Sequence, residues 1–147
     1  MEQTIAEINQ LVGAYAQKIL ALGDEVCSVK PATGKWSKKE VIGHLVDSAQ
    51  NNLQRFVRAQ YASNPKIVYA QDEWVAIQDY QDYPLDEVVQ LWVMLNKHLC
   101  HVLRRMPPEC YSYTCDTGKK DVELHDLKWL AVDYAAHLRH HLSNLAV

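Results

Sequence analysis

The chain has 147 residues, of which 48% are hydrophobic and 22% are charged, and its formal net charge is −3. This length fits one domain, and the composition is ordinary for a folded protein and argues against intrinsic disorder. The small negative charge and the lack of a basic run argue against nucleic-acid binding, and no apolar stretch reaches the roughly 18 residues of a membrane span.

The start of the chain and the cysteines predict a cytoplasmic protein. The first ten residues, MEQTIAEINQ, are polar and acidic, whereas a secretion signal is basic and then apolar. The four cysteines include no C-x-x-C pair, which argues against a zinc ribbon. Free thiols in a reducing compartment are the simplest interpretation, although Cys110 and Cys115 could pair if oxidised.

The first predicted helix begins at the sequence TIAE, where Thr4 and Glu7 have the spacing of a capping box. Gly23 can end this helix in a left-handed conformation. Between these two points, apolar residues recur at alternating intervals of three and four, the spacing of one helix face: Ile5, Ile8, Val12, Tyr15, Ile19 and Leu22.

The second predicted helix begins at WSKKEV and should continue to about Tyr61, before the sequence SNP breaks it. Ser37 and Glu40 form a second capping-box pattern, and Trp36 can pack against Val41 across it. The predicted inner face of this helix consists of Val41, Ile42, Leu45, Val46, Leu53, Phe56 and Val57.

Two further helices are predicted in the second half of the chain. The third begins just after Pro84, with acidic residues in its first turn, and ends at the two prolines 107 and 108. The fourth begins near Asp126 and continues nearly to the C-terminus. The expected inner residues of the third helix are Val88, Leu91, Leu95, Leu99, Val102 and Met106, and those of the fourth are Leu127, Leu130, Tyr134, Leu138, His141 or Leu142, and Leu145.

Four amphipathic helices predict an all-α four-helix bundle that forms a single domain over residues 1–147. Only the sequence CYSYTC, residues 110–115, suggests a short extended piece. The connection over residues 62–84 is much longer than the 2 to 8 residues usual between antiparallel neighbours. Such a connection can cross the bundle and leave the second and third helices parallel, which gives up-down-down-up connectivity.

The sequence DYAAHLRHHL, residues 133–142, contains a candidate metal site. His137 and His141 are four residues apart and share one helix face, whereas His140 points elsewhere. The pair can be two ligands of one metal ion, or two half-buried histidines held by hydrogen bonds. A tetrahedral site needs a third protein ligand. His44 is a candidate, because up-down-down-up connectivity makes its helix antiparallel to the last helix and places all three histidines at a similar depth.

The helical phase of His44 is an argument against this site. His44 points about 100° or more away from the apolar face of its helix, and Ser48, Asn51 and Arg55 continue a polar stripe from it. From the residues alone, this stripe is interpreted as a solvated face, with the wall of an open cleft as the alternative.

The other polar candidates have weaker functional interpretations. His98 and His101 are expected at the surface, and His125 is expected to help cap the last helix. Asp47 and Asp133 are interpreted as solvated acids, although either could orient a ligand histidine. Trp74 could cover the cleft, although anchoring the long connection to the core is the commoner use of a tryptophan.

Three segments together resemble the DinB-like superfamily of damage-inducible bacterial proteins. They are KWSKKEVIGHLVDSAQNNLQRF, QDEWVAIQDYQDYPLDEVVQLW and LKWLAVDYAAHLRHHLSNL, and the resemblance covers most of the chain from Trp36 onward. It implies an up-down-down-up four-helix bundle, a homodimer, and a divalent metal ion bound by three histidines. On this sequence those ligands are His44, His137 and His141.

The resemblance also implies the kind of chemistry to expect. Three neutral imidazoles leave a coordination position open, which is typical of catalytic sites. Zinc or nickel is favoured as the ion, with iron or manganese as further candidates. We expect a metal-dependent enzyme that activates a low-molecular-weight thiol, or water, for transfer or hydrolysis on a small-molecule substrate. The alternative is a non-catalytic metal-binding stress or sensor protein that acts as a dimer.

Overall fold

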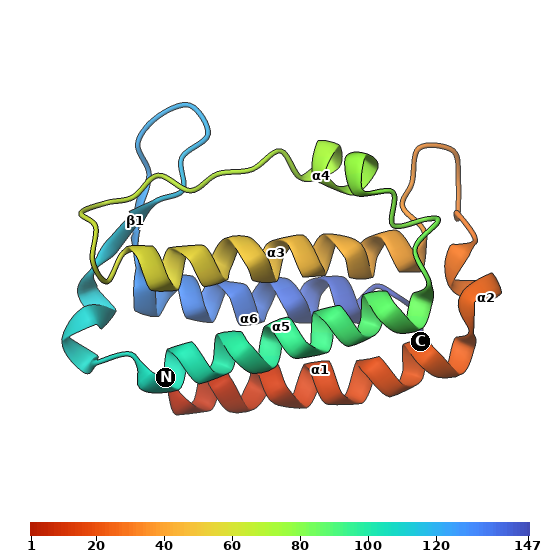
Figure 1. The fold of residues 1–147 in the computed structure, drawn as a ribbon, viewed down its shortest axis with the longest axis horizontal. Coiled ribbons are helices and arrows are strands. Elements are labelled where there is room, and N and C mark those ends of the chain that lie inside the picture. The colour runs from red at the N-terminus through yellow and green to blue at the C-terminus, as the bar shows by residue number, and fades with distance from the viewer.

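The computed structural model describes residues 1–147, and its body is a bundle of four long helices. These are α1 (Glu2–Leu22), α3 (Lys38–Arg58), α5 (Leu85–Arg105) and α6 (Leu127–Ser143). In Figure 1, α1 and α6 run in one direction and α3 and α5 in the other, so the predicted up-down-down-up connectivity is confirmed. Both α1 and α3 pack against α5 and α6. The helices α3 and α6 are therefore antiparallel neighbours.

The remaining elements are short and lie outside the bundle. They are α2 (Asp24–Ser28), α4 (Gln71–Gln78), the 3₁₀-helix η1 (Pro108–Ser112), β1 (Thr114–Asp116) and β2 (Leu124–Asp126). The two strands pair antiparallel, with Thr114 opposite Asp126, which matches the short extended piece expected near residue 115. None of the helices combines the length and the apolar character that a membrane crossing requires.

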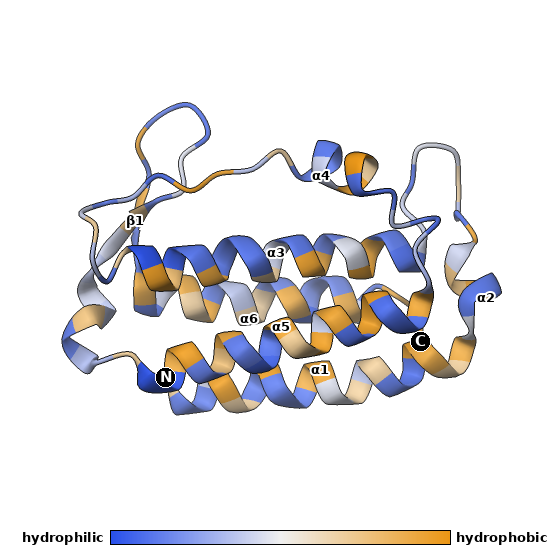
Figure 2. Ribbon diagram, viewed as in Figure 1, coloured by the Kyte–Doolittle hydropathy of each residue, from blue (hydrophilic) through white to orange (hydrophobic).

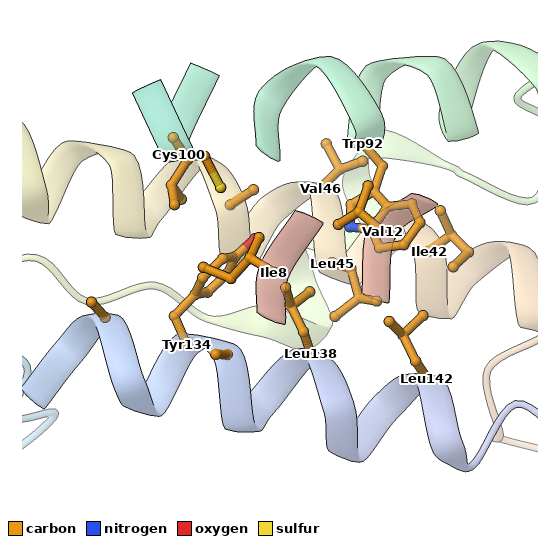
Figure 3. Close-up of a cluster of buried hydrophobic side chains, with 14 of the residues drawn as sticks. Ile8, Val12, Ile42, Leu45, Val46, Trp92, Cys100, Tyr134, Leu138 and Leu142 are labelled. Carbon is orange, nitrogen blue, oxygen red and sulfur yellow. The ribbon is translucent and has the colours of Figure 1, made fainter. Parts of the chain in front are cut away.

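One hydrophobic core joins the four long helices. Apolar residues form stripes that face the inside of the bundle in Figure 2. In Figure 3, Ile8 and Val12 from α1, Leu45 from α3, Trp92 from α5 and Leu138 from α6 point into one layer. All five residues are buried. Because each helix contributes to the same layer, no helix can bury its apolar face without the others.

The start of α3 is as predicted, and the start of α1 is not. The Ser37 hydroxyl accepts a hydrogen bond from the Glu40 amide (3.1 Å), and the Ser37 amide donates to the Glu40 carboxylate (2.7 Å), which confirms the capping box. The capping box expected at Thr4 and Glu7 is wrong, because α1 already begins at Glu2. The Ile5 amide donates to the Met1 carbonyl (3.0 Å), so this first turn is already helical and its buried Ile5 anchors it to the core.

The inner face of α5 is broader than the predicted stripe and is rotated from it. Leu91, expected inside, is 37% exposed, whereas Trp92 and Asn96 are buried. The reason is tertiary, since α5 packs against both α1 and α3 and must bury two sides. The buried Asn96 side chain is satisfied, because its amide oxygen accepts from the Tyr134 hydroxyl (2.6 Å) and its amide nitrogen donates to the Trp92 carbonyl (2.8 Å).

The long connection between α3 and α5 runs back along α3 and is fixed to it (Figure 1). Helix α3 ends at Arg58, slightly before the predicted Tyr61, which is exposed and has no packing to hold it in the helix. Farther along, the Tyr80 ring packs over Gly43, where an added Cβ would lie 2.1 Å from the ring. The Asp47 carboxylate accepts hydrogen bonds from the Tyr80 hydroxyl (2.6 Å) and the Gln78 amide (2.7 Å). We call residues 65–80 the strap.

The strap corrects the interpretation of Asp47 as a solvated acid. Its side chain is buried under Tyr80, and one of its carboxylate oxygens has no hydrogen-bond partner. Burial raises the pKa of Asp47, while the hydrogen bonds from Tyr80 and Gln78 oppose that rise. Asp47 therefore joins the strap to α3.

Candidate metal centre

Three histidines from two antiparallel helices meet at one point between α3 and α6. His44 is buried on α3, and the half-buried His137 and His141 lie one turn apart on α6. One nitrogen donor atom from each of the three rings lies within 4.8 Å of those of the other two. The structure thus brings together the three residues that the sequence singled out, although His44 and His137 are 93 positions apart in the sequence.

The rings face one another at close range. The centroid separations are 5.1 Å for His44 and His137, 4.8 Å for His44 and His141, and 4.5 Å for His137 and His141. His140 is exposed and is not one of the residues whose donor atoms converge. This agrees with its predicted helical phase.

The spacing of the nitrogens suits a divalent ion. The Nε2 atoms of His44 and His137 are 3.2 Å apart. A tetrahedral zinc ion with bonds of about 2.05 Å separates two ligand nitrogens by about 3.3 Å. The longest distance between donor nitrogens of the three histidines, 4.8 Å, exceeds this spacing of about 3.3 Å. A small inward movement of one ring would bring all three nitrogens to the spacing of zinc ligands.

The environment of the three rings keeps them neutral. Burial, and then the neighbouring His137 and His141, lower the pKa of His44 to about 3. Burial and the adjacent His141 lower the pKa of His137 to about 4, and burial lowers the pKa of His141 as well. Neutral imidazoles are the form that binds metal ions, so the lone pairs are available near pH 7.

Two further side chains contact the histidines. The Ser48 hydroxyl lies 3.3 Å from Nδ1 of His137, the ring nitrogen opposite the one that faces His44. The Trp36 ring lies 5.0 Å from the His44 ring, at an angle of 33°. Nδ1 of His44 is buried and has no hydrogen-bond partner. The orientation of His137 is therefore set by a hydrogen bond, and that of His44 by packing.

The polar stripe on α3 is buried, so its interpretation as a solvated face is wrong. Ser48 is 2% exposed and Asn51 is 3% exposed. Helix α6 and the strap cover this side of α3, and the side-chain amides of Asn51 and Asn52 turn back to carbonyls of their own helix. The contact between Ser48 and a histidine was not predicted, and the one sequence signal for it is that Ser48 follows His44 by four residues on the same helix face.

The other candidate residues lie away from the three histidines. His98 and His101 are exposed on α5, as expected, and Asp133 is exposed on α6. His125 does not cap α6, because that position is filled by Asp126, whose carboxylate accepts from the Trp129 amide (2.7 Å). His125 lies in β2 and stacks on the Trp129 ring at 3.8 Å.

Trp74 and the cysteines are also in packing contacts away from the three histidines. The half-buried Trp74 packs edge-on against Tyr69 within the strap, with ring centroids 5.4 Å apart. The neighbouring Val75, not Trp74, reaches the core. Cys110 and Cys115 are buried as free thiols, like the other two cysteines.

Comparison with known proteins identifies the family of the chain and solved structures with the same fold. The family model of the DinB superfamily matches residues 4–145. A protein of Oceanobacillus iheyensis named "Putative metal-dependent hydrolase OB0782" is 28% identical over 99% of this chain and 83% of its own length. A protein of Bacillus mycoides with a name of the same kind is 27% identical over 99% of this chain and 83% of its own length.

Two solved structures share the fold. YfiT from Bacillus subtilis, described as "a probable metal-dependent hydrolase with an unusual four-helix bundle topology", has a TM-score of 0.86 and 20% identity over 98% of this chain and 82% of its own. The mycothiol-dependent maleylpyruvate isomerase has a TM-score of 0.82 and 12% identity over 99% of this chain and 60% of its own. At these identities, the two structures are similar to this chain in fold.

Proposed function

Because the chain belongs to the DinB superfamily, we propose that His44, His137 and His141 bind one divalent metal ion and that the protein is a metal-dependent enzyme acting on a small-molecule substrate. The observation that carries this proposal is the convergence of three neutral imidazoles from two helices. Relatives named as metal-dependent hydrolases support the same class of activity.

The donor set fits a catalytic ion better than a structural one. Structural zinc sites have four protein ligands, whereas the residues around these rings supply three. His137 and His141 are half-buried, so small molecules can approach the cluster from their side. Imidazole suits zinc or nickel, which we propose first, and also iron or manganese.

Such an ion, when bound, supplies Lewis-acid chemistry that lowers the pKa of a water or a thiol and provides a nucleophile near neutral pH. The residues of the chain hold and orient the ligands. Ser48 can accept a hydrogen bond from Nδ1–H of His137, which fixes the tautomer with its Nε2 lone pair toward the cluster. Trp36 and the burial of His44 exclude water from one side.

We propose two related reactions for this site. In hydrolysis, water adds to the substrate and the bond to the leaving group breaks. In thiol transfer, a new bond forms between the thiol sulfur and an electrophilic carbon, the leaving group departs with its electron pair, and the thiol proton goes to solvent. A low-molecular-weight thiol is a candidate substrate because one structural neighbour is mycothiol-dependent.

The first experiment is elemental analysis of the protein purified without a nickel column or chelator. The wild type should contain about one divalent ion per chain. The His44→Gln variant should contain none, and the matched His140→Gln variant should retain the ion, because His140 lies outside the cluster. Circular dichroism checks that both variants are folded.

A second experiment separates the enzyme from a non-catalytic metal-binding protein. The metal-loaded wild type is incubated with a small thiol and a chromogenic electrophile, and separately with an activated ester. Steady turnover that His44→Gln loses and His140→Gln retains supports the enzyme. Bound metal without turnover, together with a metal-dependent change in oligomeric state, would instead support a sensor that acts as a dimer.

A further inference from the structure

Arg55 is a partly buried cation that has no carboxylate partner. It lies on the same face of α3 as Ser48, seven residues farther along the helix. Its Nη2 donates to the Ile67 carbonyl of the strap (3.0 Å), and its Nη1 lies 3.4 Å from the Asn52 amide oxygen. Its Nε is buried and has no hydrogen-bond partner. No carboxylate lies within ion-pair distance of the guanidinium.

This arrangement is costly for a residue with only a structural role. A guanidinium removed from water needs an anion or a full set of acceptors to offset its lost hydration. Burial lowers the pKa of Arg55, opposed by Cys115, Tyr69 and the exposed Asp133. Arginine nevertheless keeps its charge in proteins. The Arg58 side chain on the same helix, by contrast, is exposed.

Arg55 is also close to the histidines. The Cα of Arg55 is about 10 Å beyond that of Ser48 at 1.5 Å per residue, and long side chains on a helix lean back toward its N-terminus. The guanidinium therefore lies within about 10 Å of the Ser48 hydroxyl, which contacts His137.

Tyr69 of the strap is half-buried. Burial raises the pKa of Tyr69, while the Ser48 hydroxyl and the Arg55 charge oppose that rise. The contacts that link Arg55 to the histidines run through Asn52, whose amide oxygen lies 3.4 Å from Nη1 of Arg55 and whose amide nitrogen lies 3.4 Å from the Ser48 hydroxyl. The Ser48 hydroxyl in turn contacts His137, and we call His137, Ser48, Asn52 and Arg55 the polar path.

We propose that Arg55 binds the carboxylate of a small acidic ligand whose reactive end reaches the histidine cluster. This inference rests on the proposed function and names the substrate class for that site. The Arg55 side chain is only half-buried, and each of its two Nη groups has an N–H beyond the bonds to Asn52 and Ile67. A carboxylate can accept hydrogen bonds from these N–H groups and supply the missing negative charge. The bond from Nη2 to the Ile67 carbonyl holds the guanidinium in place before the ligand arrives.

The test uses two thiols of equal length, 3-mercaptopropionate and 3-mercapto-1-propanol, titrated calorimetrically into zinc-loaded protein. The acid should bind the wild type at least about tenfold more tightly than the alcohol, the range of a charge-assisted hydrogen bond. Arg55→Met should abolish this preference, so that the acid and the alcohol bind with equal affinity. Arg55→Lys should keep part of the preference. The control Arg58→Met should retain the full preference, because Arg58 is exposed on the same helix.

A spectroscopic readout makes the inference independent of metal loading. The Nε–H resonance of Arg55, assigned by its absence in Arg55→Met, should shift when propionate is added to the protein, with or without zinc. If propionate and 3-mercapto-1-propanol bind together, the carboxylate belongs to the electrophile. If propionate competes with 3-mercaptopropionate, the carboxylate belongs to the thiol.

The outcomes separate this inference from the proposed function. Zinc binding with equal affinity for the two thiols, or a preference that survives in Arg55→Met, would overturn the role of Arg55 and leave the metal site standing. Absence of zinc binding would overturn the proposed function. In that case an unshifted Nε–H resonance with propionate would overturn the role of Arg55 as well.

Discussion

At the scale of single residues, burial of the three histidines disfavours their protonation and leaves their nitrogen lone pairs free to bind a metal ion. Each ring sits where burial disfavours its protonated form, so the folded protein holds them neutral. The unfolded chain protonates the same rings near their ordinary pKa of about 6.5. Metal binding and acid sensitivity therefore have one origin, the burial of this cluster.

We predict that the metal-free protein loses stability as the pH falls from about 6.5 toward 4. Because the folded pKa values of His44 and His137, about 3 and about 4, lie below the unfolded value, the unfolded state binds more protons in this range. Each histidine should contribute a slope of up to about 1.4 kcal/mol per pH unit. Urea unfolding of wild type and His44→Gln at pH 5 and 6.5 measures it, and an equal pH dependence in both proteins would contradict the assignment.

Ser48 provides a second prediction at this scale. Replacing it by alanine removes the hydrogen bond at Nδ1 of His137 and frees that ring to rotate. We expect Ser48→Ala to weaken zinc binding by about 10-fold to 100-fold, measured by competition with a chromogenic chelator. The control is Ser143→Ala, because Ser143 is exposed on α6. Equal zinc affinities in the two variants would show that Ser48 does not position His137.

At the scale of elements, α3 carries different contacts on its different sides. Its apolar side packs into the core, the side with His44 and Ser48 meets α6, and the side with Gly43 and Asp47 holds the strap. This explains why so much of the helix is buried, polar residues included.

Gly43 and Gly13 give a matched pair that tests the strap. A Cβ at Gly43 would lie 2.1 Å from the Tyr80 ring, so Gly43→Ala must displace the strap and should destabilise the protein by about 1–3 kcal/mol. A Cβ at Gly13, inside α1, meets nothing within 4 Å, and Gly13→Ala should stabilise by up to about 1 kcal/mol. Thermal unfolding of both variants measures the difference, and the same sign for both would contradict this packing.

At the scale of the whole molecule, connectivity places the candidate site. The histidines meet because α3 and α6 are antiparallel neighbours, and these helices are antiparallel because the long connection makes α3 and α5 parallel. A short connection would give an up-down-up-down bundle with α3 parallel to α6, and His44 would then lie at the wrong depth. The single core supports our proposal that residues 1–147 form one domain.

A ligand shared by two helices should stabilise the whole bundle. We predict that zinc raises the melting temperature of the wild type, because an ion that binds only the folded state adds about 2.7 kcal/mol at a free concentration 100 times its Kd. His44→Gln should show no such increase, and His140→Gln should show the full one. Equal zinc effects on both variants would assign the stabilisation to another site. Chelator should reverse the increase.

The sequence by itself determined the four long helices, their connectivity and the three histidines. Helical periodicity, the Ser37–Glu40 capping box and the H-x-x-x-H spacing depend on residues within one or two turns, and local sequence records such relations. The length of the connection then limited how the helices could be arranged. The family resemblance selected His44 against the evidence of its helical phase.

Only the tertiary structure decided what covers each face. Periodicity shows that His44, Ser48 and Arg55 share one side of a helix, but it cannot show whether water or another segment lies opposite. Here α6 and the strap lie there, so Ser48 and Asp47 are buried, Arg55 lacks an anion, and the inner face of α5 spans two neighbours. Burial is a property of contacts between segments distant in sequence, and those contacts form only when the whole chain has folded.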